Sequence, residues 1–125
     1  MLSARSKHII NSFPFLLGVT LVICFFLLPI LGSDLSYFPG HMGDGRLVTY
    51  ILEHAYNFFI GKEPSLWNAP FMHPEPNIIT YSENLVGSAP FYSVFRLLGA
   101  DRETSFQLWF VVMYLLNYAC AYFFL

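Results

Sequence analysis

The side chains of this 125-residue chain that could do chemistry gather in one polar stretch, residues 33–83. Six of the eight acidic residues lie in it: Asp34, Asp44, Glu53, Glu63, Glu75 and Glu83. Carboxylates can take the proton of a reacting hydroxyl group, and they can also bind a divalent cation. Any reaction or ligand binding is therefore expected in this stretch.

Asp44 is the first candidate for a catalytic residue. It precedes a segment with helical periodicity, in the order His41-Met42-Gly43-Asp44-Gly45-Arg46. A carboxylate here can act as the general base for an attacking hydroxyl group. The same position suits a helix N-cap, which would explain Asp44 without any chemistry. His41 is close by, but one His and one Asp do not complete a coordination shell, so no metal site is predicted.

Five further residues of the stretch are candidates for substrate binding: Arg46, Glu53, His73, Glu75 and Glu83. Arg46 suits a bidentate contact with a phosphate, although pairing with Glu53 or with lipid headgroups is the simpler expectation. Glu53 is expected on the solvated side of a helix. His73 and Glu75 stand between prolines in a loop, where a solvent-facing turn is the plain alternative to function.

The composition indicates a membrane protein. Hydrophobic residues make up 56% of the chain and charged residues only 11%, whereas an average soluble domain is about a quarter charged. The net charge of -2 and the lack of a basic stripe exclude nucleic acid as an expected partner. Cys24 and Cys120 both lie in apolar runs and are interpreted as small hydrophobic residues.

The hydrophobic pattern predicts an all-α membrane protein with two to three transmembrane helices. Residues 9–31 and 105–125 are each about as long as a bilayer requires. Residues 84–98 are shorter and are interpreted as a short broken helix inside a larger bundle or, alternatively, as a re-entrant segment. Arg5 and Lys7 precede the first span, so the N-terminus is predicted to be cytoplasmic and residues 32–83 an extracytoplasmic loop. A cleaved signal peptide is the alternative for the first span, although its apolar region would be unusually long.

Inside the loop, residues 46–60 show the spacing of an amphipathic helix. Apolar residues recur three and four positions apart, at Leu47, Val48, Ile51, Leu52, Ala55, Phe58 and Phe59. Such a helix next to a span is expected to lie in the membrane interface. The prolines that follow forbid a regular helix, and Trp67, Phe71 and Tyr81 there suit an aromatic belt or, alternatively, a platform for stacking a sugar.

Several short stretches resemble the GT-C class of membrane glycosyltransferases, especially bacterial members that use polyprenyl-phosphate sugars and their uncharacterised relatives. The stretches are Gly43-Asp44-Gly45-Arg46, Trp67-Asn68-Ala69-Pro70, His73-Pro74-Glu75-Pro76-Asn77, Tyr81-Ser82-Glu83-Asn84-Leu85 and Asn117-Tyr118-Ala119-Cys120-Ala121-Tyr122. The resemblance implies sugar transfer from a lipid-linked donor at the outer face of a bacterial cytoplasmic membrane. It implies that Asp44 is the general base or helps to hold a divalent metal.

The resemblance matches only the first part of such an enzyme. Further spans toward the C-terminus, or a partner subunit, are expected to complete it, and the 125 residues alone are expected to be inactive. The alternative from another class is a small non-catalytic membrane protein whose outer loop binds a partner subunit.

Overall fold

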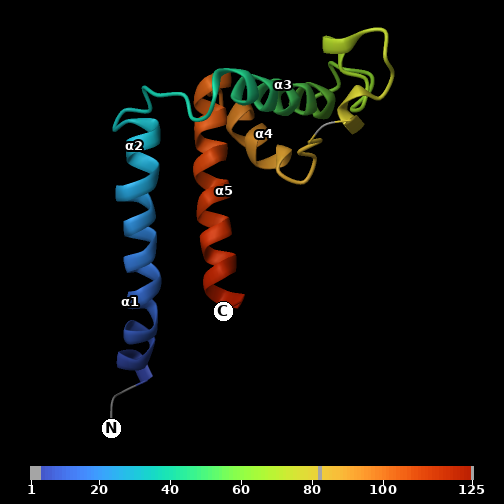
Figure 1. The fold of residues 1–125 in the computed structure, drawn as a ribbon. Helices are drawn as coiled ribbons and strands as arrows, with labels where there is room; N and C mark the ends of the chain where they lie inside the picture. The colour runs from blue at the N-terminus through green and yellow to red at the C-terminus, as the bar shows by residue number, and fades with distance from the viewer. Residues whose placement is uncertain (1–3, 82, 125) are drawn as a thin grey trace. The chain divides into compact units, whose positions relative to one another are not determined.

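A computed structural model describes residues 4–81 and 83–124, with side chains from residue 13 onward except that of Met42. All regular structure in this described part is helical (Figure 1). The chain forms two compact units, one of Met1–Tyr37 with Val111–Leu125 and one of Phe38–Phe110. The side chains of Arg5 and Lys7, on which the predicted orientation depends, lie outside the described part.

The first predicted span is one continuous helical rod. Helix α1, Ala4–Val22, passes into a π-helical turn η1, Ile23–Leu27, and then into α2, Leu28–Leu31. Pro29 has no N–H for the carbonyl four residues earlier, and the wider turn before it accommodates this defect. Gly32 ends the rod with a φ of 75°, a conformation that suits glycine. The helix therefore covers the predicted span of residues 9–31 and begins before it.

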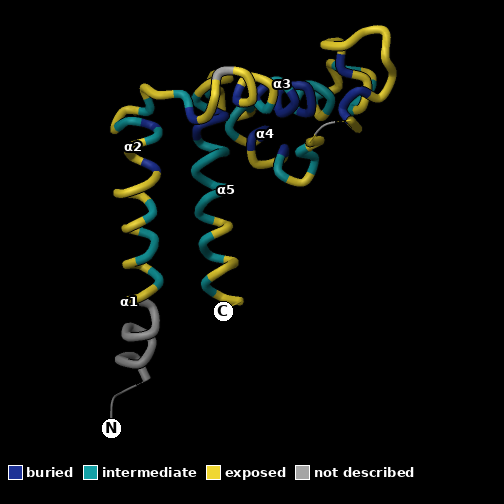
Figure 2. Tube along the Cα trace, viewed as in Figure 1, coloured by how far each residue is buried: buried dark blue, intermediate teal, exposed yellow. Residues whose placement is uncertain are grey.

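The second long helix is α5, Arg102–Phe124, close to the predicted 105–125. Asp101 caps it, since its Oδ1 accepts a hydrogen bond from the Thr104 N–H at 2.8 Å. In the first unit, the Phe15 ring contacts the rings of Tyr118, Tyr122 and Phe123. Phe13–Leu31 and α5 are both long and apolar enough to cross a membrane, and few of their residues are buried (Figure 2).

The second unit contains α3, Met42–Phe59, α4, Ala89–Leu97, and the first turns of α5. Their shared core consists of Leu52, Ala55, Ala89, Tyr92 and Phe106. Helix α3 begins four residues before the predicted start at residue 46. At nine residues, α4 is about 14 Å long, so it is too short to cross about 30 Å of hydrocarbon.

The proline-rich connection folds back onto α3 with two short 3-10 turns, η2 (Pro70–Met72) and η3 (Ile78–Tyr81). Ala69, Ile78 and Ile79 pack with Ile51 of α3 in a second apolar cluster. The N–H of Ile79 donates to the Trp67 carbonyl at 3.2 Å. The connection is therefore packed against α3 rather than free in solvent.

Candidate functional site

The pocket that contains Asp44 lies at the start of α3. Asp44 is in the first turn of that helix, and together with Glu83 it lines a cavity of about 190 Å³. Leu47, Val48 and Ile51 form the apolar part of the lining. Both carboxylates belong to exposed residues. The structure thus brings together two of the predicted site residues, which lie far apart in the sequence.

The predicted N-cap role of Asp44 is wrong. The cap is His41, whose Nδ1 accepts the Gly43 N–H at 3.3 Å and whose carbonyl accepts the Gly45 N–H at 2.9 Å. Asp44 is three residues further on, where its charge still favours the positive helix end. Its side chain is therefore not needed to close the first hydrogen bond of α3.

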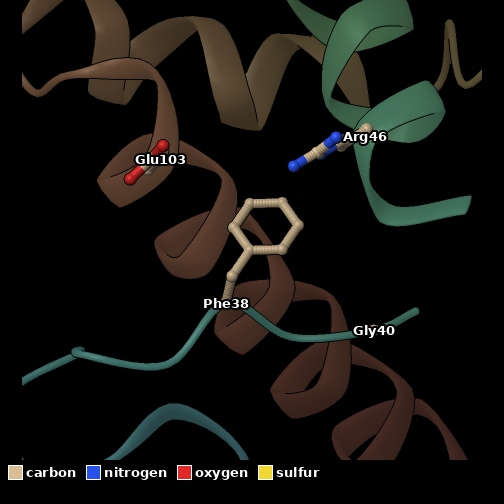
Figure 3. A pocket seen from close by; sticks show the side chains of 4 residues that line it. All are labelled: Phe38, Gly40, Arg46 and Glu103. Carbon is tan, nitrogen blue, oxygen red and sulfur yellow. The ribbon is translucent and has the colours of Figure 1, made fainter. Parts of the chain in front are cut away.

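Arg46 lines a different cavity, of about 310 Å³, together with Phe38, Gly40 and Glu103. In Figure 3 the Phe38 ring lies between the side chains of Arg46, from α3, and Glu103, from α5. An adjoining hollow of about 250 Å³ shares Phe38, Arg46 and Glu103 and adds Arg102 to the lining. Two arginines against one glutamate leave a net positive charge, which suits an anionic group.

Asp44 and Arg46 serve different cavities because they stand two residues apart on one helix. At about 100° per residue they point about 200° from each other around α3. The motif that holds both therefore does not make a single site. It places a carboxylate on one side of the helix and a guanidinium group on the other.

Glu53 is buried, so its predicted place on a solvated helix face is wrong. Its Oε2 accepts the Tyr92 hydroxyl at 2.6 Å and Arg96 Nε at 2.9 Å, and its Oε1 accepts Arg96 Nη2 at 3.0 Å. Arg102 Nε is 3.8 Å from Oε1. The expected pairing of Arg46 with Glu53 is also wrong, because Arg96 forms the ion pair with Glu53.

The hydrogen bonds from Arg96 and Tyr92 keep the buried Glu53 carboxyl group ionised. Burial alone would raise the pKa of Glu53, but the hydrogen bonds from Arg96 and Tyr92 outweigh it and lower that pKa below its usual value. Burial and the bond to Glu53 raise the pKa of Tyr92, so this phenol stays protonated. Arg96 also lies over the Tyr56 ring and donates to the Ala100 carbonyl at 2.6 Å. Its guanidinium group is therefore bound within the chain.

His73 and Glu75 stay apart from both cavities. They are exposed in the turn between η2 and η3, and neither lines the hollows that hold Asp44 or Arg46. Trp67, Phe71 and Tyr81 are likewise exposed on this connection. Their roles as an aromatic belt or a sugar platform stay predictions.

A metal ion would find few protein ligands in this unit. Within the described residues, no group of three or more His, Cys, Asp and Glu side chains gathers. Asp44 and Glu83 alone offer oxygen ligands of the kind that Mg²⁺ takes while it keeps several of its waters. Only such a hydrated ion would fit the pocket.

The residues that the sequence left unassigned are Tyr92, Arg96, Arg102 and Glu103, which complete the buried network and the arginine cavity. One signal was available for Arg96, because it is the single charged residue in positions 84–98. No protein-family model, curated protein or solved structure matches the chain.

Proposed function

We propose that this chain is the N-terminal part of a membrane glycosyltransferase of the GT-C class. The enzyme would transfer a sugar from a polyprenyl phosphate donor at the extracytoplasmic face of a bacterial cytoplasmic membrane. The observation that carries the proposal is the pocket of Asp44 and Glu83, in which Asp44 is exposed while His41 caps the helix. A carboxylate that does not cap its helix and that lines a cavity is available to act as a general base.

In the proposed reaction the acceptor hydroxyl attacks the anomeric carbon of the donor sugar. The new C–O bond forms as the bond to the polyprenyl phosphate breaks, and that phosphate leaves with the electron pair. Asp44 takes the hydroxyl proton, and Leu47, Val48 and Ile51 form the apolar wall beside it. Glu83 accepts a hydrogen bond from a second hydroxyl of the ligand.

Arg46 and Arg102 supply positive charge for an anionic group away from the reacting carbon, such as a lipid headgroup. They line adjoining hollows on the other side of α3 from Asp44, where the planar guanidinium groups can form bidentate contacts with phosphate. His73 and Glu75, on the exposed turn, are candidates for contacts with the distal part of the substrate.

The test is Asp44→Asn in the full reading frame that contains this chain. Transfer of labelled sugar from a polyprenyl phosphate donor should fall by at least about 100-fold, because general base catalysis contributes about 10²–10⁴-fold. Asp34→Asn is the matched control. It makes the same chemical change, and an amide oxygen can still accept the Ser36 N–H, so transfer should not change. Full transfer activity in Asp44→Asn would refute the role of Asp44.

One observation favours the second candidate, a non-catalytic subunit whose outer loop binds a partner. Trp67, Phe71, Met72 and Tyr81 are all exposed on the connection between α3 and α4. Aromatic residues and Met are enriched where proteins bind each other. On this hypothesis Tyr81→Ser with Met72→Ser would release a co-purifying subunit, while Asp44→Asn would leave the complex and its activity unchanged.

A further inference from the structure

Helix α4 has two faces with opposite surroundings. Ala89, Tyr92, Ser93 and the Arg96 guanidinium group face α3 and the core, where the first three are buried. The opposite arc, about 120° wide at about 100° per residue, carries Pro90, Phe91, Val94, Leu97 and Leu98. All five are exposed, and Leu97 and Leu98 are 67% and 78% exposed. The outer face of α4 therefore holds no polar or charged side chain.

The apolar stripe predicted for α3 is in a different situation. Ile51, Leu52 and Ala55, its central residues, are buried against the rest of the unit. Of the stripe, Leu47 and Phe59 remain exposed near the two ends of the helix. The amphipathic face that still lacks a partner is thus that of α4.

Most backbone groups at the two ends of α4 are paired by hydrogen bonds within the chain. At the start, the N–H groups of Ala89 and Phe91 donate to Leu85 and Ser88 at 2.8 and 3.1 Å, and Pro90 has no N–H. At the end, the carbonyls of Val94, Phe95 and Arg96 accept the N–H groups of Leu98, Ala100 and Gly99 at 3.0–3.1 Å. Water can satisfy such groups in solution, but lipid cannot, so this pairing suits a hydrocarbon environment.

The position of α4 in its unit points the same way. Phe106, in the second turn of α5, packs in one core with Ala89 and Tyr92 of α4. In Figure 1, α4 lies on the side of α3 toward which the first turns of α5, those of the same unit, run. A short turn, residues 98–101, joins α4 to α5, whose charged first residues Arg102 and Glu103 suit the headgroup level.

We propose that Phe91, Val94, Leu97 and Leu98 form a lipid-embedded face, which fixes α4 in the boundary between headgroups and acyl chains. This inference rests on the membrane placement of α5 but not on sugar transfer. A protein partner is disfavoured as the occupant, because protein interfaces carry a polar rim and hydrogen-bonding groups and this face has none. The short interfacial helix would hold the Asp44 and Arg46 cavities at a fixed height above the hydrocarbon.

The experiment measures the surroundings of single nitroxide labels in the full chain. Cys24 and Cys120 are first replaced by Ser, and one cysteine is then placed at position 94 or 98 in vesicles of phosphatidylethanolamine and phosphatidylglycerol. Neither Val94 nor Leu98 belongs to the core, so these labels should leave the fold intact, which Trp fluorescence verifies. Lys62→Cys is the water-exposed control, and Leu116→Cys in α5 is the lipid control.

We expect labels at positions 94 and 98 to collide readily with oxygen and at least about tenfold less with a water-soluble nickel chelate than the label at position 62. If the label at position 116 collides mainly with oxygen but the label at position 98 collides readily with the nickel chelate, the lipid-embedded face of α4 is refuted, while the membrane placement of α5 is not. Water-like behaviour at both would overturn the membrane placement as well. Dipolar broadening between labels, or protection from both reagents, would show that a second copy or another protein covers the face and would also overturn it.

Discussion

Removing the Glu53 carboxylate should be among the most damaging single changes to the Phe38–Phe110 unit. Glu53 accepts three hydrogen bonds from Tyr92 and Arg96, at 2.6, 2.9 and 3.0 Å, and so joins α3 to α4. Removing one partner of a buried ion pair costs about 3–5 kcal/mol, because the other charge is left without compensation. We expect Glu53→Ala to reduce the free energy of unfolding by about 3 kcal/mol, near the lower end of that range.

We expect a cost near the lower end of this range because Arg96 keeps other contacts in Glu53→Ala. Its side chain is 22% exposed, and it still binds the Ala100 carbonyl and lies over the Tyr56 ring. Arg102 changes the estimate little, because its side chain is 63% exposed and solvent screens such a pair. Glu53→Gln keeps an acceptor but loses the charge, and neutral hydrogen bonds are about half as strong as charged ones. Its cost should therefore be about half that of Glu53→Ala.

The unit offers a convenient probe of its own unfolding. Both tryptophans of the chain, Trp67 and Trp109, lie within residues 38–110, so their fluorescence during denaturation in micelles reports on this unit. Glu53→Ala, Arg96→Met and the double variant form a cycle, for which we expect a coupling of about 2 kcal/mol. Glu75→Gln, an exposed acid-to-amide change, should stay within about 0.5 kcal/mol of the wild type. A coupling below about 0.5 kcal/mol would refute the assigned role of the network.

The same network predicts how stability depends on pH. The pKa of Glu53 is lower in the folded chain than in the unfolded chain, so the unfolded chain binds more protons in acid. The stabilisation is fully present above about pH 4.3, the usual value for glutamate, and is lost as the pH falls through the lower folded value. The stability difference between wild type and Glu53→Gln should therefore shrink in acid. A difference that stays constant down to the acid unfolding of both proteins would contradict this assignment.

Three further predictions concern the first turns of the helices and the topology. A Cβ at Gly45 would lie 2.8 Å from Phe38 Cε1, so Gly45→Val should lower the free energy of unfolding, measured by denaturation, by about 1–3 kcal/mol. A Cβ at Gly43 would lie 3.7 Å from its nearest neighbour, so Gly43→Ala should not lower it. Asp101→Ala should speed hydrogen exchange at the Thr104 amide and Asp101→Asn should not, because Asn also caps helices; equal rates in both variants would contradict the cap. Lys62→Cys should react with an impermeant thiol reagent on intact cells, and reaction only after lysis would reverse the predicted orientation.

The long helices could be predicted from the sequence because their signals are local. A run of about 20 apolar residues indicates a span wherever it occurs, and the structure has helices at both predicted places. The periodicity after Arg46 likewise predicted α3. Its start was misplaced because the N-cap is His41, and histidine is an uncommon N-cap residue. Aspartate is a common one, so the sequence pointed to Asp44 instead. The interfacial position of α3 stays a prediction.

The surroundings of single side chains could not be predicted in this way. Glu53 occupies a polar position in the periodicity of α3, and only the packing of α4, about 40 residues further on, makes that position internal. The grouping of Asp44 with Glu83 depends on how the proline-rich connection returns to α3. Both are contacts between segments distant in sequence, which periodicity does not report.

The several contacts of the Arg96 guanidinium group limit which sequences can keep this fold. One planar guanidinium group serves both oxygens of Glu53, the Ala100 carbonyl and the Tyr56 ring. Lysine has the charge but a single nitrogen, so an exchange that substitution tables treat as mild would break most of these contacts. Relatives of this chain should therefore change positions 53 and 96 together, from an ion pair to two apolar residues, and should seldom change either one alone.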